Sequence, residues 1–170
     1  RGGFSEREVG GGFVESGAVE ESRVKIEFAS KAPKNCRQAI EQLLFFNPSQ
    51  HKVRDGILKA LEKFGHPRVV ETETGLSVRV GEQEAQTLFA FDSSRRKRDP
   101  VGVVVFLRTT PTDVSIMHVA VGEKYALQGS QSGVGLGVEM VEKVKEIAAR
   151  IVGVERIVFF YRQQVVIRVR

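Results

Sequence analysis

The 170-residue sequence has a single cysteine, two tyrosines, no tryptophan and no apolar run near the roughly 20 residues that a membrane-spanning helix needs. Because Cys36 has no second cysteine to pair with, an internal disulfide and a cysteine-rich zinc site are excluded. His51 and His66 have no nearby ligand partners, so we expect no metal site. No secretory leader is recognisable, and we expect a cytoplasmic protein without a membrane partner.

The composition that is present is typical of one globular domain. Apolar residues make up 41% of the chain and charged residues 28%, and this length allows one sizeable core but not two comfortable ones. Residues 1–22 are rich in glycine and lack an apolar period, so we expect a flexible tail there. Residues 23–170 are predicted to form a single domain.

The net charge of +5 is compatible with a nucleic acid, an anionic membrane or a small polyanionic ligand. The basic run Arg95–Arg98 is most simply a solvated hairpin loop that discourages edge pairing. An anion contact and a nucleic-acid contact are the alternatives. Aromatic side chains of the kind that stack on bases are not interleaved with these arginines, so we do not expect nucleic acid as the main partner.

The apolar periodicity predicts alternating strands and helices. A half-buried strand is indicated over 24–28, and helical spacing occurs between Pro33 and Asn47, between Val53 and Gly65, and from Leu136 to Ile151. Short connections at 95–100 and 109–111 favour antiparallel neighbours. We therefore expect an α/β (α+β) fold with a mixed, mostly antiparallel sheet flanked by helices on both faces. Further strands are predicted at Leu76–Val80, Thr87–Phe91, Val101–Arg108, Asp113–Val121, Arg156–Phe160 and Val165–Val169.

A glycine-rich segment between a strand and the long helix carries the clearest functional signal. The strand that begins near Ser115 leads through Gly122–Gln131 into Ser132-Gly-Val-Gly-Leu-Gly137, which opens the helix. Glycines let backbone N–H groups approach an anion closely, and a helix start adds unpaired donors and a positive dipole end. The pattern predicts a phosphate-binding loop, with a helix-entry turn of no function as the alternative.

This segment resembles the signature of the GNAT superfamily of N-acetyltransferases. The resemblance lies in His118-Val-Ala-Val121, in Gly135 and Gly137 at the helix start, and in Gly153-Val-Glu-Arg-Ile-Val-Phe159 after it. The family's order of strand, two helices, three antiparallel strands, helix and strand also matches residues 23–160. The resemblance implies an acyl-CoA-dependent N-acyltransferase, which moves an acetyl group from acetyl-CoA, or another acyl-CoA, to a small-molecule or peptide amine by direct attack.

The resemblance also implies where acetyl-CoA binds. Its pyrophosphate would lie on backbone N–H groups of Ser132–Gly137, and its pantetheine arm would pair like an extra strand with Val119–Val121. The N–H group of Val119 would polarise the thioester carbonyl as an oxyanion donor. The implied cofactor-binding residues are Val119, Ala120, Val121, Gln131, Ser132, Gly133, Val134, Gly135, Leu136 and Gly137.

The sequence departs from the family pattern at three places. Ser132 stands where the signature has arginine or glutamine, although Gln131 is adjacent, and the loop Gly122–Gln131 is longer than usual. After Phe160 there is no room for the helix that carries the family's tyrosine general acid, so we expect an atypical or shortened C-terminus.

The candidate catalytic residues are Tyr161 and His118. Tyr161 is the closest substitute for the missing general acid, and His118 could act as a base because Ser115 occupies the usual glutamate position. Each has a structural alternative, as a strand-end tyrosine and as a packed strand histidine, and Glu123 and Tyr125 are expected to face solvent. Two rival functions remain: a non-catalytic acyl-CoA-binding domain and a basic nucleic-acid-binding module. A homodimer is left open.

Overall fold

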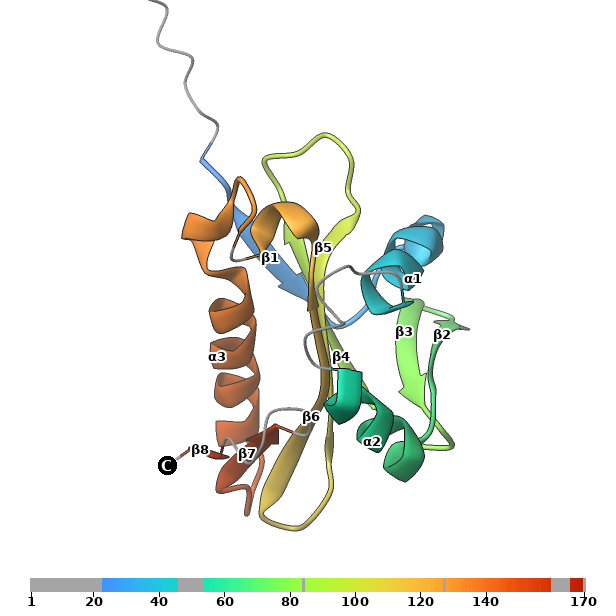
Figure 1. Ribbon diagram of the computed structural model, residues 1–170, viewed down its shortest axis with the longest axis vertical. Coiled ribbons are helices and arrows are strands. Elements are labelled where there is room, and N and C mark those ends of the chain that lie inside the picture. The colour runs from blue at the N-terminus through green and yellow to red at the C-terminus, as the bar shows by residue number, and fades with distance from the viewer. Residues whose placement is uncertain (1–22, 46–53, 84, 127, 160–165, 170) are drawn as a thin grey trace, which may run out of the picture.

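The computed structural model describes residues 23–45, 54–83, 85–126, 128–159 and 166–169. Its main feature is a six-stranded sheet with the strand order β1-β4-β5-β6-β7-β8 (Figure 1). Neighbouring strands are antiparallel except for β6 and β7, which are parallel. The strands of this sheet are β1 (Ile26–Ala29), β4 (Gln86–Asp92), β5 (Pro100–Arg108), β6 (Asp113–Val121), β7 (Arg156–Phe159) and β8 (Val166–Arg168).

Helices cover both faces of the sheet (Figure 1). One long helix, α3 (Leu136–Ala149), lies along one face. The other face carries two helices, a short 3-10 helix and a β-hairpin. These elements are η1 (Lys34–Cys36), α1 (Arg37–Phe45), α2 (Arg54–Phe64), β2 (Pro67–Thr72) and β3 (Gly75–Val80).

The sheet separates two apolar cores, because successive side chains of a strand point to opposite faces. Val103 and Val105 of β5 pack in one core with Ile40 of α1. Val104, which lies between them in the sequence, packs in the other core with Met140 of α3. All five side chains have 0% exposure. The sheet is therefore held from both sides, and the ends and edges of its strands are left for a functional site.

The predicted fold class is confirmed, including the antiparallel meander of β4, β5 and β6. Strand β2 was not predicted. Its alternation of partly buried with exposed, charged residues such as Arg68 and Glu71 is a weak strand signal. The predicted strand Leu76–Val80 pairs with β2 in a separate two-stranded sheet and does not continue the meander.

Several sequence predictions can be placed within this fold, and others cannot. The tail 1–22, His51 and Tyr161 lie outside the described residues. Cys36 is buried, and its thiol donates a 3.2 Å hydrogen bond to the carbonyl oxygen of Arg98. In the part of the chain that the structure describes, no helix has the length and apolar character needed to cross a membrane. The same residues contain no group of three or more histidine, cysteine, aspartate or glutamate side chains placed to hold a metal ion.

Candidate functional site

Strand β6 is paired with its parallel neighbour β7 along the first half of its length. The two strands are paired from Asp113 with Arg156 to Ile116 with Phe159, where the pairing among the described residues ends. The other edge of β6 stays paired with β5 as far as Val121. Between the β6–β5 pairs at Ile116 and His118, Met117 is an extra residue, so β6 carries a bulge just beyond its last described pair with β7. Bulges of this kind bend a strand and re-aim its side chains, and they are frequent beside active sites.

The glycine-rich segment follows β6 directly and forms two short helices before α3. Residues Glu123–Tyr125 form η3 and Ser132–Val134 form η4. Gly135 then adopts a left-handed conformation, with φ 63° and ψ 39°, and the α-helix begins at Leu136. The stretch Ser132–Val134 thus belongs to a separate 3-10 turn and not to the first turn of the long helix. Glycine is the residue that adopts the left-handed conformation at least cost.

At this turn some backbone N–H groups donate to backbone carbonyl oxygens, and others have no backbone acceptor among the described residues. The N–H groups of Ser132, Val134 and Gly135 donate to the carbonyl oxygens of Gly129, Gln131 and Ser132, at 3.1, 3.2 and 3.1 Å. No backbone acceptor among the described residues takes the N–H groups of Gly133, Leu136, Gly137 and Val138.

These available donors lie at the positive end of the α3 dipole, and α3 has no side-chain cap. A Cβ atom built on Gly133 or on Gly135 would meet no atom within 4 Å, so the space outside the turn is open. Open space beside available N–H groups fits the approach of a phosphate group.

Residue Tyr125 is buried, with 5% exposure, and the expectation that it faces solvent was wrong. Its ring lies in the α3-side core, and its hydroxyl donates a 2.5 Å hydrogen bond to the carboxylate of Asp92 at the end of β4. Burial, together with the bond to Asp92, raises the pKa of Tyr125 to about 12. Glu123 is exposed, as expected. Tyr125 thus joins η3 to β4, a role that no local sequence pattern indicated.

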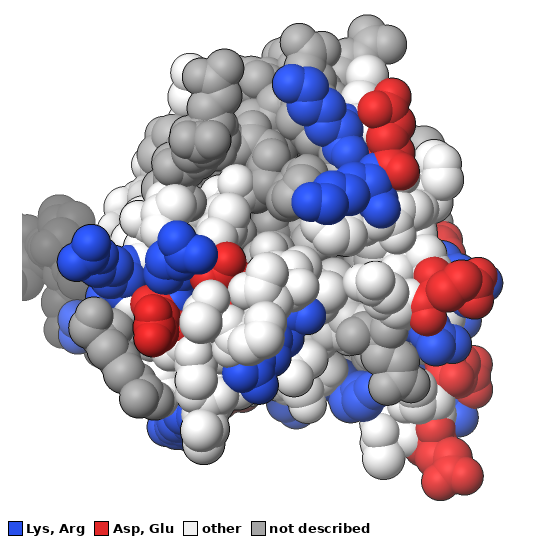
Figure 2. Space-filling view, turned by 90° about the horizontal axis from the view of Figure 1, so that it is seen from below, with Lys and Arg blue, Asp and Glu red and all other residues white. Residues whose placement is uncertain are grey.

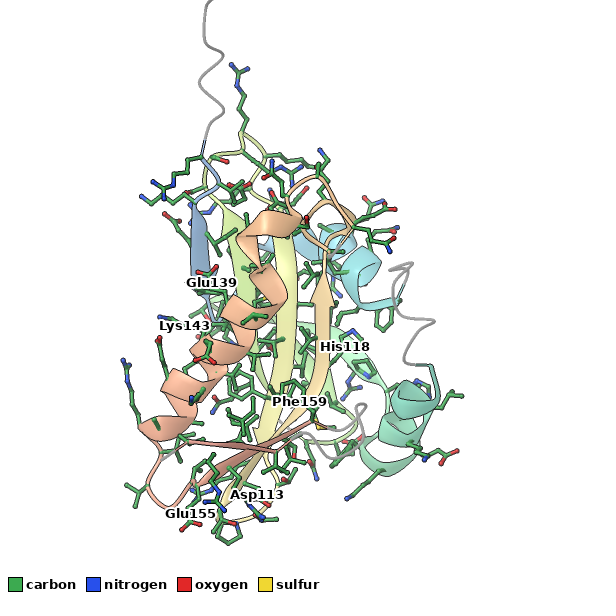
Figure 3. All side chains as sticks on the ribbon, turned by 60° about the vertical axis from the view of Figure 1, so that its left-hand side comes forward. Asp113, His118, Glu139, Lys143, Glu155 and Phe159 are labelled. Carbon is green, nitrogen blue, oxygen red and sulfur yellow. The ribbon has the colours of Figure 1, made fainter. Side chains whose placement is uncertain are left out.

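His118 lies on the side of the sheet opposite α3 (Figure 3). The side chain is 8% exposed, and burial lowers its pKa to about 4. The imidazole is therefore neutral at neutral pH, but a group with so low a pKa is a weak proton acceptor, because general bases work best with a pKa near the operating pH. This environment fits the packed-histidine interpretation better than the catalytic one.

A pocket of about 340 Å³ adjoins β7 and the N-terminal half of β6. Its wall includes Ser115 and Val158, which are paired neighbours on β6 and β7. The Ser115 hydroxyl lies 2.7 Å from the Thr109 hydroxyl, so the position at which the resemblance would lead one to expect a glutamate holds a hydrogen-bonded neutral group. The residues lining the pocket are Lys63, Phe64, Gln83, Leu107, Arg108, Thr109, Thr110, Asp113, Ser115 and Val158.

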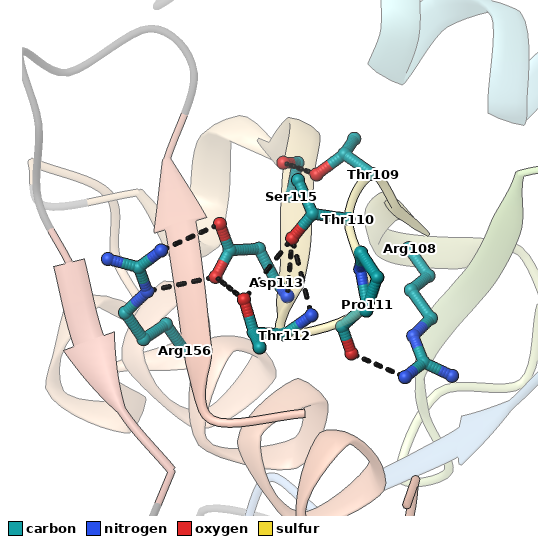
Figure 4. Close-up of polar contacts among 8 residues, drawn as sticks. All are labelled: Arg108, Thr109, Thr110, Pro111, Thr112, Asp113, Ser115 and Arg156. Carbon is teal, nitrogen blue, oxygen red and sulfur yellow. Dashed lines mark hydrogen bonds and ion pairs between the residues drawn. The ribbon is translucent and has the colours of Figure 1, made fainter. Parts of the chain in front are cut away.

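Asp113 contributes the only carboxylate among the described residues lining this pocket, and that carboxylate is already paired. Arg156 of β7 donates to it through Nε and one terminal nitrogen, at 2.9 and 3.0 Å, and the Thr112 hydroxyl donates at 3.1 Å (Figure 4). The bonded guanidinium holds the pKa of the Asp113 carboxyl below its usual value. A carboxylate stabilised in this way is a poor general base and serves to fasten β6 to β7.

The predicted cofactor-binding residues lie in the second half of β6 and in the turn that opens α3, and a Cβ atom built on Gly137 would lie 3.8 Å from the Val121 side chain. Val119 and Val121 face the α3-side core and are partly buried, whereas Ala120 is buried on the other face. Gln131 is exposed before η4, and the Leu136 side chain has 0% exposure, so Leu136 can offer only its backbone. Sequence reasoning did not find the pocket, because its walls come from α2, β5, β6 and β7, which are far apart along the chain.

No family model and no curated protein sequence matches this chain. The solved structures that are similar to it include three acetyltransferases. An acetyltransferase from Streptococcus agalactiae 2603 has 15% identity and a TM-score of 0.45, over 79% of this chain and 71% of that one. An acetyltransferase assigned to the GNAT family from Desulfovibrio desulfuricans has 16% identity and a TM-score of 0.42, over 79% and 72%. The IAA acetyltransferase from Bacillus cereus ATCC 14579 has 20% identity and a TM-score of 0.37, over 79% and 65%. The fold class of the present chain follows from its own strand order and register.

Proposed function

We propose that this protein is an acyl-CoA-dependent N-acyltransferase that uses acetyl-CoA, or another acyl-CoA, as its acyl donor. One arrangement carries the proposal: β6 has a bulge at Met117, just beyond its last described pair with β7, and after Val121 it leads into a turn with available N–H groups at the start of α3. A strand that leads into a turn with available N–H groups suits a ligand that has a phosphate end and an amide-containing arm.

The chain's own groups would hold the donor in two ways. The N–H groups of Gly133, Leu136 and Gly137 would bind the pyrophosphate, and the pantetheine arm would lie along the backbone of Val119–Val121. Bound acetyl-CoA would supply an activated thioester. The Val119 N–H would then act as the oxyanion donor, a contribution typically worth a few kcal/mol in the transition state.

The pocket beside Ser115 and Val158 is the proposed site of the amine acceptor. It lies beside the paired residues Ser115 and Val158, two positions before the Met117 bulge of β6, so an acceptor held there would lie close to a donor bound along the second half of β6. Its volume lies near the lower end of the range for small-ligand pockets, about 300–1,000 Å³. Apolar walls from Phe64, Leu107 and Val158 with hydroxyls from Thr109 and Ser115 favour a small amine, or the end of a peptide, with an apolar part.

The groups available for proton transfer bear on whether the protein is an enzyme or a non-catalytic acyl-CoA-binding protein. The Asp113 carboxylate in the pocket wall is ion-paired with Arg156. His118 is not among the described residues of that wall, and its pKa is lowered to about 4, so neither group is suited to act as the general base. Tyr161, predicted from the sequence as the general acid, would protonate the departing thiolate. A non-catalytic acyl-CoA-binding protein is the alternative that the paired Asp113 favours.

Calorimetric titration of the full chain with acetyl-CoA tests the donor site, and thiol release with a panel of amines and peptide N-termini tests the reaction. We expect binding and thiol release, with kcat lowered roughly 10²–10⁴-fold in Tyr161→Phe at unchanged acetyl-CoA affinity. Equal rates in the two proteins would remove Tyr161 from the mechanism. Binding without thiol release from any amine would establish the non-catalytic alternative, and absence of binding would refute both functions.

A further inference from the structure

We propose that Arg95 and Arg96, in the hairpin that joins β4 to β5, form a second anion site that binds the 3′-phosphate of a CoA ligand. The inference rests on the proposed function, because the glycine-rich turn would place the pyrophosphate of the same ligand nearby. It assigns a role to the basic run that the strand–turn–helix signature leaves unexplained.

The hairpin and the glycine-rich turn lie at the same end of the molecule, as Figures 1 and 3 both show. A series of hydrogen bonds connects them. Asp92, at the end of β4, accepts from Tyr125 of η3, and the carbonyl oxygen of Lys124 in η3 accepts a 2.7 Å bond from the N–H of Gln131, which precedes η4. Arg95 also interacts with the Tyr125 hydroxyl. The first arginine of the run therefore borders the segment that leads into η4.

Backbone contacts fix the base of the hairpin. The Ser94 N–H donates to the Asp92 carboxylate at 3.0 Å, and the Arg95 N–H donates to the Asp92 carbonyl oxygen at 3.2 Å. On the outer side, the N–H of Ser93 donates to the carbonyl oxygen of Lys25, which precedes β1, at 2.8 Å. The turn that presents Arg95 and Arg96 is thus anchored to β1 and to η3, so binding would order two side chains and not a whole loop.

The four basic residues of the run differ in their acidic partners. Lys97 pairs with Asp99 at 2.8 Å, and Arg98 lies 3.9 Å from Glu27. Arg95 and Arg96 are exposed, and no ion pair between described residues involves either of them. At the opposite end of the molecule, basic and acidic side chains are interspersed (Figure 2). Among the described residues, Arg95 and Arg96 are therefore the two basic residues of the hairpin that have no acidic partner.

The chemistry of the pair suits a phosphate monoester. Such a group carries a charge of about −1.5 to −2 at neutral pH and offers three acceptor oxygens, and guanidinium groups bind it through two parallel hydrogen bonds. A pyrophosphate linkage on the glycine-rich turn and a monoester on the arginine pair would divide the charges of one CoA molecule between two neighbouring sites. Discrimination for the 3′-phosphate would then come from Arg95 and Arg96 alone.

The test compares the affinities of the full chain for acetyl-CoA and for 3′-dephospho-acetyl-CoA, measured by calorimetry. We expect the parent protein to bind acetyl-CoA at least tenfold more tightly. The double variant R95S/R96S should bind both ligands equally, with the parent's affinity for the dephospho form. Lys97→Ser is the matched control, because that lysine is already paired with Asp99, and it should keep the preference.

The outcomes separate this inference from the function on which it rests. Equal binding of the two ligands by the parent would overturn the 3′-phosphate site while leaving the acyl-CoA function standing. A preference that persists in R95S/R96S would overturn it equally. If the parent bound neither ligand, the proposed function would fail and the inference with it. Unfolding curves of the variants check that a lost preference does not come from lost structure.

Discussion

The hydroxyl of Tyr125 donates a 2.5 Å hydrogen bond to the carboxylate of Asp92, and this contact joins the segment after β6 to the end of β4. Burial by itself would raise the pKa of the Asp92 carboxyl, but hydrogen bonds from Ser94 and Tyr125 hold it below its usual value. The pair therefore anchors both proposed anion sites, because η3 leads into the glycine-rich turn and Asp92 begins the basic hairpin.

Removing the phenol hydroxyl in Tyr125→Phe should destabilise the protein. The carboxylate of Asp92 loses a buried partner, and losses of this kind cost roughly 1 to 3 kcal/mol. Urea unfolding at neutral pH measures the change in the free energy of unfolding. Glu123→Gln, an exposed change in the same 3-10 turn, is the control and should stay within about 0.5 kcal/mol of the parent. Equal stability of Tyr125→Phe and this control would contradict the anchoring role.

The titration of Tyr125 should be displaced to high pH. Because its pKa is raised to about 12 from an ordinary value of 10, the stabilisation is fully present below pH 10 and is lost as the pH rises through 12. The chain has two tyrosines, so Tyr161→Phe leaves Tyr125 as the sole source of tyrosinate absorbance. We expect that absorbance to rise near pH 12. A rise centred near pH 10 would mean that Tyr125 is exposed.

The low pKa of Asp92 makes an acid-sensitivity prediction. A carboxyl whose pKa is lowered by folding adds stability above its unfolded value, about 3.9, and loses this contribution as the pH falls through the folded pKa. Between pH 7 and pH 3 the parent should therefore lose more unfolding free energy than Asp92→Asn, which keeps an acceptor oxygen but does not titrate. Denaturant unfolding at both pH values measures this difference. Parallel losses in the two proteins would assign the acid sensitivity to other carboxylates.

At the glycine-rich turn, ligand binding can be tested with substitutions that are not expected to change the stability of the fold. A side chain at Gly133 would meet no atom within 4 Å, so Gly133→Ala and Gly133→Glu should both fold like the parent. The glutamate would place negative charge where the pyrophosphate is proposed to bind, and acetyl-CoA affinity should fall at least tenfold, about 1.4 kcal/mol. The alanine variant controls for the loss of glycine, and calorimetry measures both. Unchanged affinity in Gly133→Glu would place the pyrophosphate elsewhere.

Gly135 is less suited to this test, although the sequence signature singles it out. Its φ of 63° lies in the left-handed region, where a side chain is strained. A variant at Gly135 would therefore mix a change in stability with any change in ligand binding.

Local sequence was sufficient to predict the strand, the glycine-rich turn and the long helix over Asp113–Ala149. Strand alternation, glycine spacing and helical periodicity act between residues a few positions apart, so each can be read from a short window. The antiparallel meander was predictable for the same reason, because short connections leave little choice of partner. Strand β2 was not predicted because its half-exposed, charged pattern is a weak strand signal, and the strand is recognised only from its pairing with β3.

Tertiary structure alone decided how distant residues meet. Asp92 and Tyr125 are 33 positions apart in the sequence, so no local pattern shows that they form a buried hydrogen bond. Asp113 and Arg156 are 43 positions apart, so no local pattern shows that the carboxylate in the pocket wall is ion-paired. The low pKa of His118 is likewise set by the elements packed around it and not by its neighbours in the chain. Burial and ion pairing depend on which surfaces the folded chain brings together. The protonation states of Asp113 and His118 are therefore set by the tertiary structure.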